Sequence, residues 1–353
     1  MSAPAPRVLI ADPSSVFSKM FSQAAAELDK RAPVKCVASC AQARGEIARA
    51  DFDIIVIDAD TSGGDALELL SDIMHRIPTA YILFTTRPSS ISEKLCANAM
   101  ARGASDYLIK PLDKSYNDNY SMVRERLRGT LRILRGGDAR HAVGSEGVAP
   151  KKPKPKHRFK PGLVVIAAST GGPMALDKIL TELNSDYPIP ILIVQHMPLH
   201  FTEVMAQSLN QKSALHVKTA QDNETIAAGT VYIAPGGTHM KLNAESRIVL
   251  DNSPARGGVR PAADVLFESV ADSYAGSGVA VIILTGMGND GEKGLARLKA
   301  RQNCECLAQS EQTCVVYGMP RAVVEAGLAD SILDLDDIAR ALNAYSSAGS
   351  VKQ

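Results

Sequence analysis

A serine stands where an apolar stretch ends and an amphipathic segment begins. Residues 163–172 read LVVIAASTGG, so the β-branched run stops at Ser169 and two glycines follow Thr170. This pattern predicts a strand that turns tightly into a helix N-terminus, where backbone N–H groups favour negative charge. A serine so placed can be a nucleophile beside part of an oxyanion hole, or it can simply cap the helix. The nucleophile interpretation requires a base elsewhere in the chain.

The strand predicted next along the chain supplies a base. His196 directly follows the apolar run ILIVQ, one β/α unit after Ser169, which places both residues at one edge of a sheet. Imidazole exchanges protons near neutral pH and can carry the serine proton to a leaving alcohol. Asp290 lies in the loop TGMGNDG after the apolar run VAVIIL, where it can orient the imidazole. The chain order Ser, His, Asp is admissible because geometry defines a triad.

Two other histidines have weaker claims. His200 lies at a predicted helix N-terminus, where it can contact a substrate, and His239 follows the loop sequence PGGT, where it can line the cleft. Only His196 has a serine and an acid at matching strand ends.

The first half of the chain carries a different set of reactive groups. Asp12 follows the first predicted strand, Asp58 the third, Thr85 the fourth and Lys110 the fifth. The carboxyl ends of parallel strands meet at one sheet edge, the usual ligand site of such folds. These groups suit transient phosphorylation, in which a carboxylate attacks, Mg²⁺ held by acids neutralises charge, and lysine and threonine contact the phosphate.

The elements that position these groups alternate between strand and helix. In the first part, strands are predicted at residues 7–11, 34–38, 54–57, 81–84 and 106–109, and helices at 16–28, 41–49, 66–76, 91–102 and 116–134. In the second part, strands are predicted at 163–167, 191–195, 231–234, 247–250, 279–284 and 306–308, and helices at 173–183, 201–211, 262–274, 292–299 and 323–327. Such alternation predicts parallel sheets with helices on both faces.

Between the two series the pattern collapses into glycine, proline and lysine, which is typical of a linker. Its run KKPKPKHR is interpreted as a solvated, extended spacer, and the alternative is that it binds an acidic surface. The predicted fold class is α/β, with two doubly wound parallel-sheet (Rossmann-like) domains, residues 6–128 and 161–345, joined by a flexible linker, residues 129–160.

Composition narrows the class of protein. A chain of 353 residues favours two domains. Its 39 Lys and Arg nearly balance 38 Asp and Glu, so charge gives no support for a nucleic-acid partner. Six scattered cysteines without paired CxxC motifs indicate reduced thiols. Without a signal peptide or an apolar run of spanning length, we expect a cytoplasmic protein that is not membrane-embedded.

Residues 6–128 resemble a response-regulator receiver domain, and the segment GASDY that ends at Tyr107 matches the family's approach to its lysine. The resemblance implies that Asp58 is the phosphoacceptor. It also implies a switch hydroxyl at Thr85, a phosphate partner at Lys110 and an aromatic switch at Tyr107. Asp12 and Asp58 would then hold Mg²⁺, the cofactor of receiver phosphorylation, and a chemotaxis histidine kinase would be the phosphodonor.

The sequence departs from the receiver pattern in two loops. Asp12 is followed by Pro13, where receivers carry a second acid, and the loop after Asp58 lacks the usual proline at Ser62. Asp60 is a further carboxylate in that loop. We expect phosphorylation with weakened Mg²⁺ dependence or rate.

The second half resembles the bacterial chemotaxis protein-glutamate methylesterase over residues 161–340. The matching segments are ASTGGP, QHMP, YIAPG, RP followed by DVLF, TGMGNDG and GMPR. The resemblance implies a catalytic triad of Ser169, His196 and Asp290. It also implies that the backbone N–H of Met287, with N–H groups near Thr170, holds the oxyanion.

The activity that the resemblance implies is phosphorylation-regulated hydrolysis of glutamate methyl esters on methyl-accepting chemotaxis receptors. Hydrolysis releases methanol, related enzymes also deamidate receptor glutamines, and the esterase needs no cofactor. One alternative is a receiver-controlled module that binds a nucleotide phosphate, although the chain lacks the motif GxxxxGK[ST]. A second alternative is a general hydrolase of small esters, since specificity lies in the cleft.

Overall fold

The computed structural model describes residues 5–89, 91–110, 115–134 and 159–347. It divides the chain into two compact units, Met1–Ala139 and Arg140–Gln353, which are described separately below. The division falls within the predicted linker, residues 129–160, of which residues 135–158 lie outside the described part. Among the described helices, none combines the length and the apolar composition that crossing a membrane requires.

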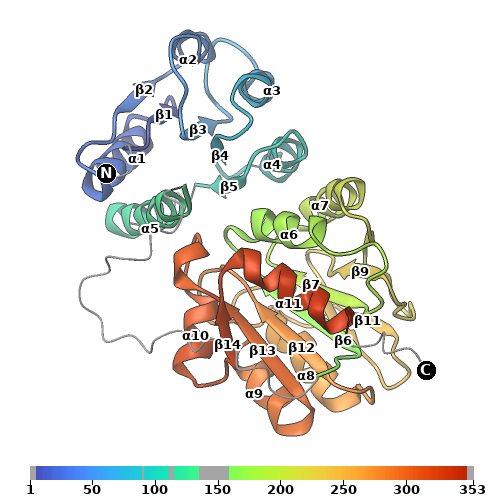
Figure 1. Ribbon diagram of the computed structural model, residues 1–353. Coiled ribbons are helices and arrows are strands. Elements are labelled where there is room, and N and C mark those ends of the chain that lie inside the picture. The colour runs from blue at the N-terminus through green and yellow to red at the C-terminus, as the bar shows by residue number, and fades with distance from the viewer. Residues whose placement is uncertain (1–4, 90, 111–114, 135–158, 348–353) are drawn as a thin grey trace. The chain divides into compact units, whose positions relative to one another are not determined.

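The first unit is a five-stranded parallel sheet with helices on both faces. Its strands are β1 (Val8–Ala11), β2 (Val34–Val37), β3 (Ile54–Asp58), β4 (Tyr81–Thr86) and β5 (Asp106–Ile109), in the order β2-β1-β3-β4-β5. Its helices are α1 (Ser15–Leu28), α2 (Cys40–Ile47), α3 (Ala66–Arg76), α4 (Ser92–Ala101) and α5 (Tyr116–Leu134). Helices α1 and α5 pack together on one face, and α2, α3 and α4 cover the other (Figure 1).

Local sequence explains these elements. Strands β1, β3 and β4 are buried along their whole length, as the apolar runs at their centres require. The side chain of Ser14 accepts a hydrogen bond from the Phe17 N–H and starts α1, which buries Phe17, Met20 and Phe21. Helix α5 continues to Leu134, beyond the predicted domain boundary at residue 128.

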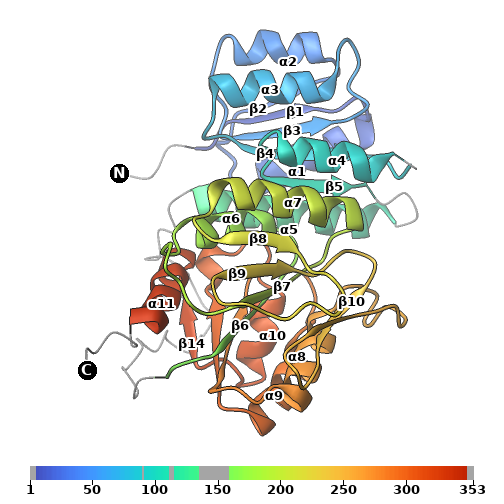
Figure 2. The ribbon, with the colours of Figure 1, turned by 90° about the vertical axis from the view of Figure 1, so that its right-hand side faces the viewer.

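The second unit is built on a seven-stranded parallel sheet in the order β14-β13-β12-β6-β7-β9-β8. These strands are β6 (Leu163–Ala168), β7 (Ile191–Gln195), β8 (His216–Thr219), β9 (Thr230–Ile233), β12 (Val279–Ile283), β13 (Cys304–Gln309) and β14 (Ser331–Leu333). Its helices are α6 (Gly172–Thr181), α7 (Leu199–Lys212), α8 (Ala263–Ser273), α9 (Glu292–Arg301), α10 (Met319–Glu325) and α11 (Leu335–Ser347). Helices α6, α7 and α11 lie on one face and α8, α9 and α10 on the other (Figures 1 and 2).

The predicted class, α/β with doubly wound parallel sheets, is confirmed for both units. Some elements differ from the prediction. The predicted strand at 247–250 is β11 (Ile248–Asp251), which pairs antiparallel with β10 (His239–Leu242) outside the main sheet. Strands β8, β10 and β14 were not predicted, because they are only three or four residues long and lack a continuous apolar run. Helix α11 was also not predicted.

Strand order decides which residues meet. Strand β6 lies between β7 and β12, all three are wholly buried, and Ala168 pairs with Gln195 while Ala167 pairs with Ile283. The residues that follow these strands therefore emerge side by side at one edge of the sheet. The core beneath them packs β6, β7 and β12 against Leu266, Phe267 and other apolar side chains of α8 and α9.

Candidate functional site

Ser169 is the first residue after β6 and begins a tight turn into α6. Its N–H donates to the carbonyl oxygen of Thr285 at 3.0 Å, and its own carbonyl accepts from the Gly172 N–H at 2.8 Å. Gly171 adopts a φ of 78°, which disfavours residues with a side chain, and a Cβ there would lie 2.5 Å from Val315 Cγ2. The turn thus depends on glycine, and it leaves Ser169 half-buried at the sheet edge.

Two buried polar side chains hold this turn from both neighbouring strands. Gln195, which is 1% exposed, donates from Nε2 to the Ser169 carbonyl oxygen at 2.9 Å. Thr285, which is fully buried, donates from Oγ1 to the Thr170 carbonyl oxygen at 2.9 Å. Sequence reasoning missed both residues. A signal for both was present in the sequence: Gln195 is a polar residue that ends the apolar strand β7, and Thr285 is a polar residue shortly after the apolar strand β12.

The structure brings His196 and Asp290 together. His196 directly follows β7, and its Nε2 lies 2.7 Å from Oδ2 of Asp290. Both side chains are largely buried, with 11% and 12% exposed. The His196 N–H donates to the carbonyl oxygen of Ala168, the residue before Ser169, at 3.1 Å. His196 and Ser169 therefore directly follow two paired strands at the same register position.

The carboxylate of Asp290 has three donors. Besides His196, the Ala263 N–H donates to Oδ2 at 2.6 Å and the Asp264 N–H donates to Oδ1 at 3.0 Å. Burial by itself would raise the pKa of Asp290, but the hydrogen bond and charge of His196 and the two N–H donors outweigh it and hold the pKa below its usual value. Asp290 is therefore ionised at neutral pH.

The partner of His196 determines its tautomer. An ionised carboxylate can only accept hydrogen bonds, so the proton on a neutral His196 ring resides on Nε2, which faces Asp290. The other ring nitrogen, Nδ1, then carries a lone pair and can accept a proton. With Ser169 on the adjacent strand end, the arrangement has the parts needed for general-base activation of a hydroxyl.

The loop after β12 approaches Ser169 closely. Gly286 donates its N–H to the Val316 carbonyl oxygen and accepts from the N–H of Gly318, both at 3.0 Å. The next residue, Met287, has a 63% exposed side chain, and within the described part of the chain its N–H has no acceptor. That N–H is available to a ligand at the sheet edge.

We predict that Gly286→Ala impairs activity while the fold persists. A Cβ at Gly286 would lie 2.8 Å from Ser169 Cβ and 2.4 Å from Met319 Sδ, so the serine turn must move. A displacement near 1 Å can lower a rate by about 100-fold. The measurement is ester hydrolysis by the purified variant beside Gly45→Ala, a control because a Cβ at Gly45 meets nothing within 4 Å. Equal rates for both variants would contradict the prediction.

The two other histidines of the sequence analysis, His239 and His200, differ in their exposure to solvent. His239 is fully buried, its Nδ1 accepts from the Ala262 N–H at 3.1 Å, and its Nε2 lies 3.2 Å from the Pro254 carbonyl oxygen. The expectation that it lines an accessible cleft was wrong, because both ring nitrogens are engaged by backbone. His200 is exposed at the second position of α7, as expected for a helix N-terminus.

In the first unit, the structure gathers the four predicted polar residues at one sheet edge. Lys110 Nζ lies 2.7 Å from Oδ2 of Asp12 and 2.6 Å from Oδ2 of Asp58. Thr85 Oγ1 donates to the same oxygen of Asp58 at 2.8 Å. All four side chains are at most 3% exposed. Burial is the main cause that raises the pKa of Asp12, despite the neighbouring Lys110 ammonium.

The residues around this cluster complete its contacts. The other oxygen of Asp58 accepts from the Asp60 N–H at 3.1 Å, while the Asp60 carboxylate pairs with Arg87 Nε at 2.7 Å. Tyr107 is half-buried on β5, and Arg126 of α5 donates to its carbonyl oxygen at 2.5 Å. The Asp60 carboxylate, which the sequence offered as a further acid in the loop after Asp58, is therefore paired with Arg87 in this structure.

The predicted Mg²⁺ ligands in this cluster, Asp12 and Asp58, are two carboxylates. Asp12 and Asp58 both contact the Lys110 ammonium, and the described residues hold no group of three or more His, Cys, Asp or Glu side chains arranged for a metal. Mg²⁺ commonly keeps several waters and binds through one or two carboxylates, so the pair fits it without further protein ligands. Pro13 adds no side-chain donor.

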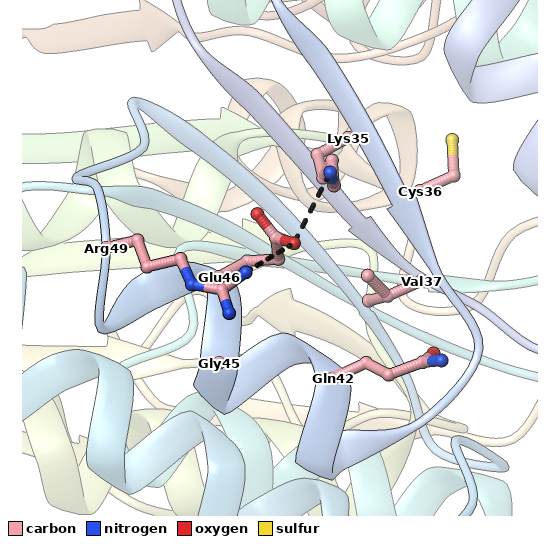
Figure 3. A pocket seen from close by; sticks show the side chains of 7 residues that line it. All are labelled: Lys35, Cys36, Val37, Gln42, Gly45, Glu46 and Arg49. Carbon is pink, nitrogen blue, oxygen red and sulfur yellow. Dashed lines mark ion pairs between the residues drawn. The ribbon is translucent and has the colours of Figure 1, made fainter.

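A cavity of about 350 Å³ lies in the first unit, beside β2 and α2 (Figure 3). Its charged lining residues satisfy one another, because Glu46 lies 3.4 Å from Lys35 and 3.8 Å from Arg49. None of the sequence-predicted site residues lines it.

Comparisons with known proteins cover both units. Residues 164–342 match the CheB methylesterase family and residues 8–116 match the response regulator receiver domain. A protein-glutamate methylesterase/protein-glutamine glutaminase of Geobacillus kaustophilus is 37% identical over 347 residues, which cover 95% of this chain and 97% of the relative. Its namesake in Bacillus subtilis is 33% identical over 351 residues, with the same coverage. The crystal structure of the Thermotoga maritima CheB methylesterase catalytic domain is 42% identical, covers 52% of this chain and 97% of its own, and gives a TM-score of 0.49.

Proposed function

The chain belongs to the CheB methylesterase family and carries a response-regulator receiver domain, and from this premise we propose how its residues carry out the family's reaction. It hydrolyses glutamate methyl esters on chemoreceptors under control of receiver phosphorylation, and we propose that it also deamidates receptor glutamines, as the names of its relatives suggest. The observation that carries the residue assignment is the 2.7 Å contact of Asp290 with His196, which follows the strand paired with that of Ser169.

In the proposed reaction, Ser169 is the nucleophile. His196 Nδ1 takes the serine proton as Oγ attacks the ester carbonyl, and Asp290 stabilises the imidazolium that forms. The imidazolium then protonates the departing methoxy group, so methanol leaves and an acyl-serine remains. Water, deprotonated by His196, hydrolyses the acyl-serine and restores Ser169. A glutamine side chain follows the same path with ammonia as the leaving group.

The negative oxygen of the tetrahedral intermediate needs donors. We assign this role to the backbone N–H of Met287 and to the N–H at Thr170, beside the N-terminus of α6. Gln195 and Thr285 support this arrangement, because they bind the carbonyl oxygens of Ser169 and Thr170 and so hold the serine turn in place. These steps use only groups of the chain and water, so the esterase reaction requires no cofactor.

In the receiver domain, Asp58 is the proposed phosphoacceptor. Lys110 and Thr85, which already contact Oδ2 of Asp58, would bind oxygens of the transferred phosphoryl group. Mg²⁺ held by Asp12 and Asp58 would supply neutralisation of the phosphoryl charge. Tyr107, on the strand next to that of Thr85, is the proposed aromatic switch. Family membership indicates a chemotaxis histidine kinase as phosphodonor.

For these substrates the proposed site of action is the cytoplasmic side of the membrane. The substrate side chains are methylated glutamates on cytoplasmic receptor helices. No nucleic acid takes part in this reaction.

The experiment that tests this function is methanol release from a methylated receptor fragment, with and without a small-molecule phosphodonor and Mg²⁺. We expect the phosphodonor to accelerate release by the wild-type chain and to leave Asp58→Asn unchanged. That variant should also take up no phosphoryl label, because its amide is a poor nucleophile. Equal labelling of both proteins would rule out Asp58 as the acceptor. A wild-type chain that releases no methanol would contradict the function itself.

A further inference from the structure

Asp264 contacts Asp290, one of the proposed catalytic residues, and the loop that follows it. Asp264 is the second residue of α8, and only 7% of it is exposed. Its Oδ1 accepts two backbone hydrogen bonds, from the Gly291 N–H at 3.1 Å and from the Gly294 N–H at 2.7 Å. Both donors belong to the segment that follows Asp290 and opens α9.

The relation between Asp264 and Asp290 is reciprocal. Asp290 accepts from the N–H groups of Ala263 and Asp264, which open α8, whereas Asp264 accepts from N–H groups that open α9. Each aspartate therefore satisfies helix N-terminal donors on the helix that adjoins the other. Helices α8 and α9 lie side by side in both views (Figures 1 and 2), and this pair of carboxylates joins their N-termini.

The close approach of the two helix ends leaves little freedom for the loop. A Cβ at Gly294 would lie 2.7 Å from the Asp264 carbonyl oxygen and 2.9 Å from Phe267 Cβ. A Cβ at Gly291, where φ is 96°, would lie 3.1 Å from the Phe267 ring. The absence of side chains at these glycines lets the backbone reach the Asp264 carboxylate.

Two carboxylates so close together are electrostatically unfavourable. Burial raises the pKa of Asp264, and the negative charge of Asp290 adds to this effect, while Arg256 opposes it. Arg256 is itself bound by Glu268 through two contacts of 2.6 Å. Despite this repulsion Asp264 is retained as the acceptor of two N–H groups, and this role depends on the Oδ1 oxygen and not on the charge.

We propose that Asp264 is a positioning residue for the His196–Asp290 pair. By holding the N–H groups of the loop after Asp290, its Oδ1 fixes the direction from which the Asp290 carboxylate meets Nε2 of His196. This inference rests on the proposed function, in which that contact orients the imidazole toward Ser169. Asp264 contacts neither the serine nor the histidine in the hydrogen bonds of the structure, and it acts through Asp290.

The test uses three variants of the full-length chain. Asp264→Ala removes the acceptor. Asp264→Asn retains it, because both donors meet a single oxygen and an amide carbonyl can replace that oxygen. Asp272→Ala is the matched control, since Asp272 also joins α8 to α9, through Arg297 at 2.7 Å and Arg301 at 2.6 Å, but lies on the surface. Methanol release from methylated receptor fragment is measured as kcat and KM, together with thermal unfolding.

We expect Asp264→Ala to lower kcat by about 10- to 100-fold with KM little changed, because substrate still binds but the imidazole is misaligned. Asp264→Asn should restore kcat to within about threefold, and Asp272→Ala should lose thermal stability without losing kcat. An Asp264→Ala variant with wild-type kcat, or an Asp264→Asn variant as slow as the alanine variant, would overturn the proposal. Because the wild-type chain is assayed on the same substrate, failure of the proposed function is seen separately, as no methanol release by any protein.

Discussion

Ser169→Ala is expected to abolish methanol release from methylated receptor, lowering kcat on the order of 10⁴-fold or more. Only the hydroxyl group is lost, and alanine suits the turn that Gln195 and Thr285 hold through backbone carbonyl oxygens. Thermal unfolding should therefore match that of the wild type. The measurement is methanol release at saturating substrate, with circular dichroism to confirm the fold.

Phosphorylation provides an internal control for this variant. Because Asp58 lies in the separate receiver unit, Ser169→Ala should take up phosphoryl label at the wild-type level. Cleavage of a small ester should be lost together with demethylation, since one serine serves both. A variant that loses demethylation but keeps ordinary ester cleavage would contradict the assignment of Ser169 as the single nucleophile.

Asp290→Asn should lose both activity and stability. One oxygen of the carboxylate accepts hydrogen bonds from Ala263 and His196, and the other accepts from Asp264. The NH₂ group of an asparagine, in either orientation of the amide, would face at least one of these N–H donors and could not accept its hydrogen bond. With Nε2 no longer facing an anion, the imidazole favours the wrong tautomer, and kcat should fall by about 10³- to 10⁴-fold. An unsatisfied buried group costs about 1–3 kcal/mol of unfolding free energy. Methanol release and denaturant unfolding measure the two effects.

Asp290→Asn should also differ from the wild type in how its stability depends on pH. The pKa of Asp290 is lower in the folded chain than in the unfolded one, so the folded state gains stability above the ordinary value of about 3.9. That gain is lost as the pH falls through the lowered folded pKa. In unfolding experiments below about pH 4, the difference in stability between wild type and Asp290→Asn should therefore shrink. A difference that stays constant from neutral to acidic pH would contradict the ionised, hydrogen-bonded Asp290.

Comparison of the two variants tests the division of roles in the site. Ser169→Ala should affect only the chemical step, whereas Asp290→Asn should affect the chemistry and the packing of α8. If both variants lost stability equally, the serine turn would have to be a structural element in its own right.

Much of the receiver site could be predicted from sequence. Asp58 ends β3, Thr85 is the last residue but one of β4 and Lys110 directly follows β5, and the strands of a doubly wound sheet end at a common edge. In the receiver unit the predicted helix ends lie within two residues of those observed, and α5, observed as predicted at residues 116–134, passes the predicted domain boundary at residue 128. The ion pair of Asp60 with Arg87 was not predictable, because it joins two loops across 27 positions of sequence.

The sequence by itself determined the α/β class, the division into two halves and the residues that end the central strands, including Ser169 and His196. These follow from local signals, because apolar runs define buried strands and polar residues mark where they stop. Only the tertiary structure decided that Nε2 of His196 meets Asp290, that His239 is enclosed, and that Asp264 and Asp290 cap each other's helices. Such contacts depend on the order of strands and on the meeting of two helix ends, which no local pattern of side chains encodes.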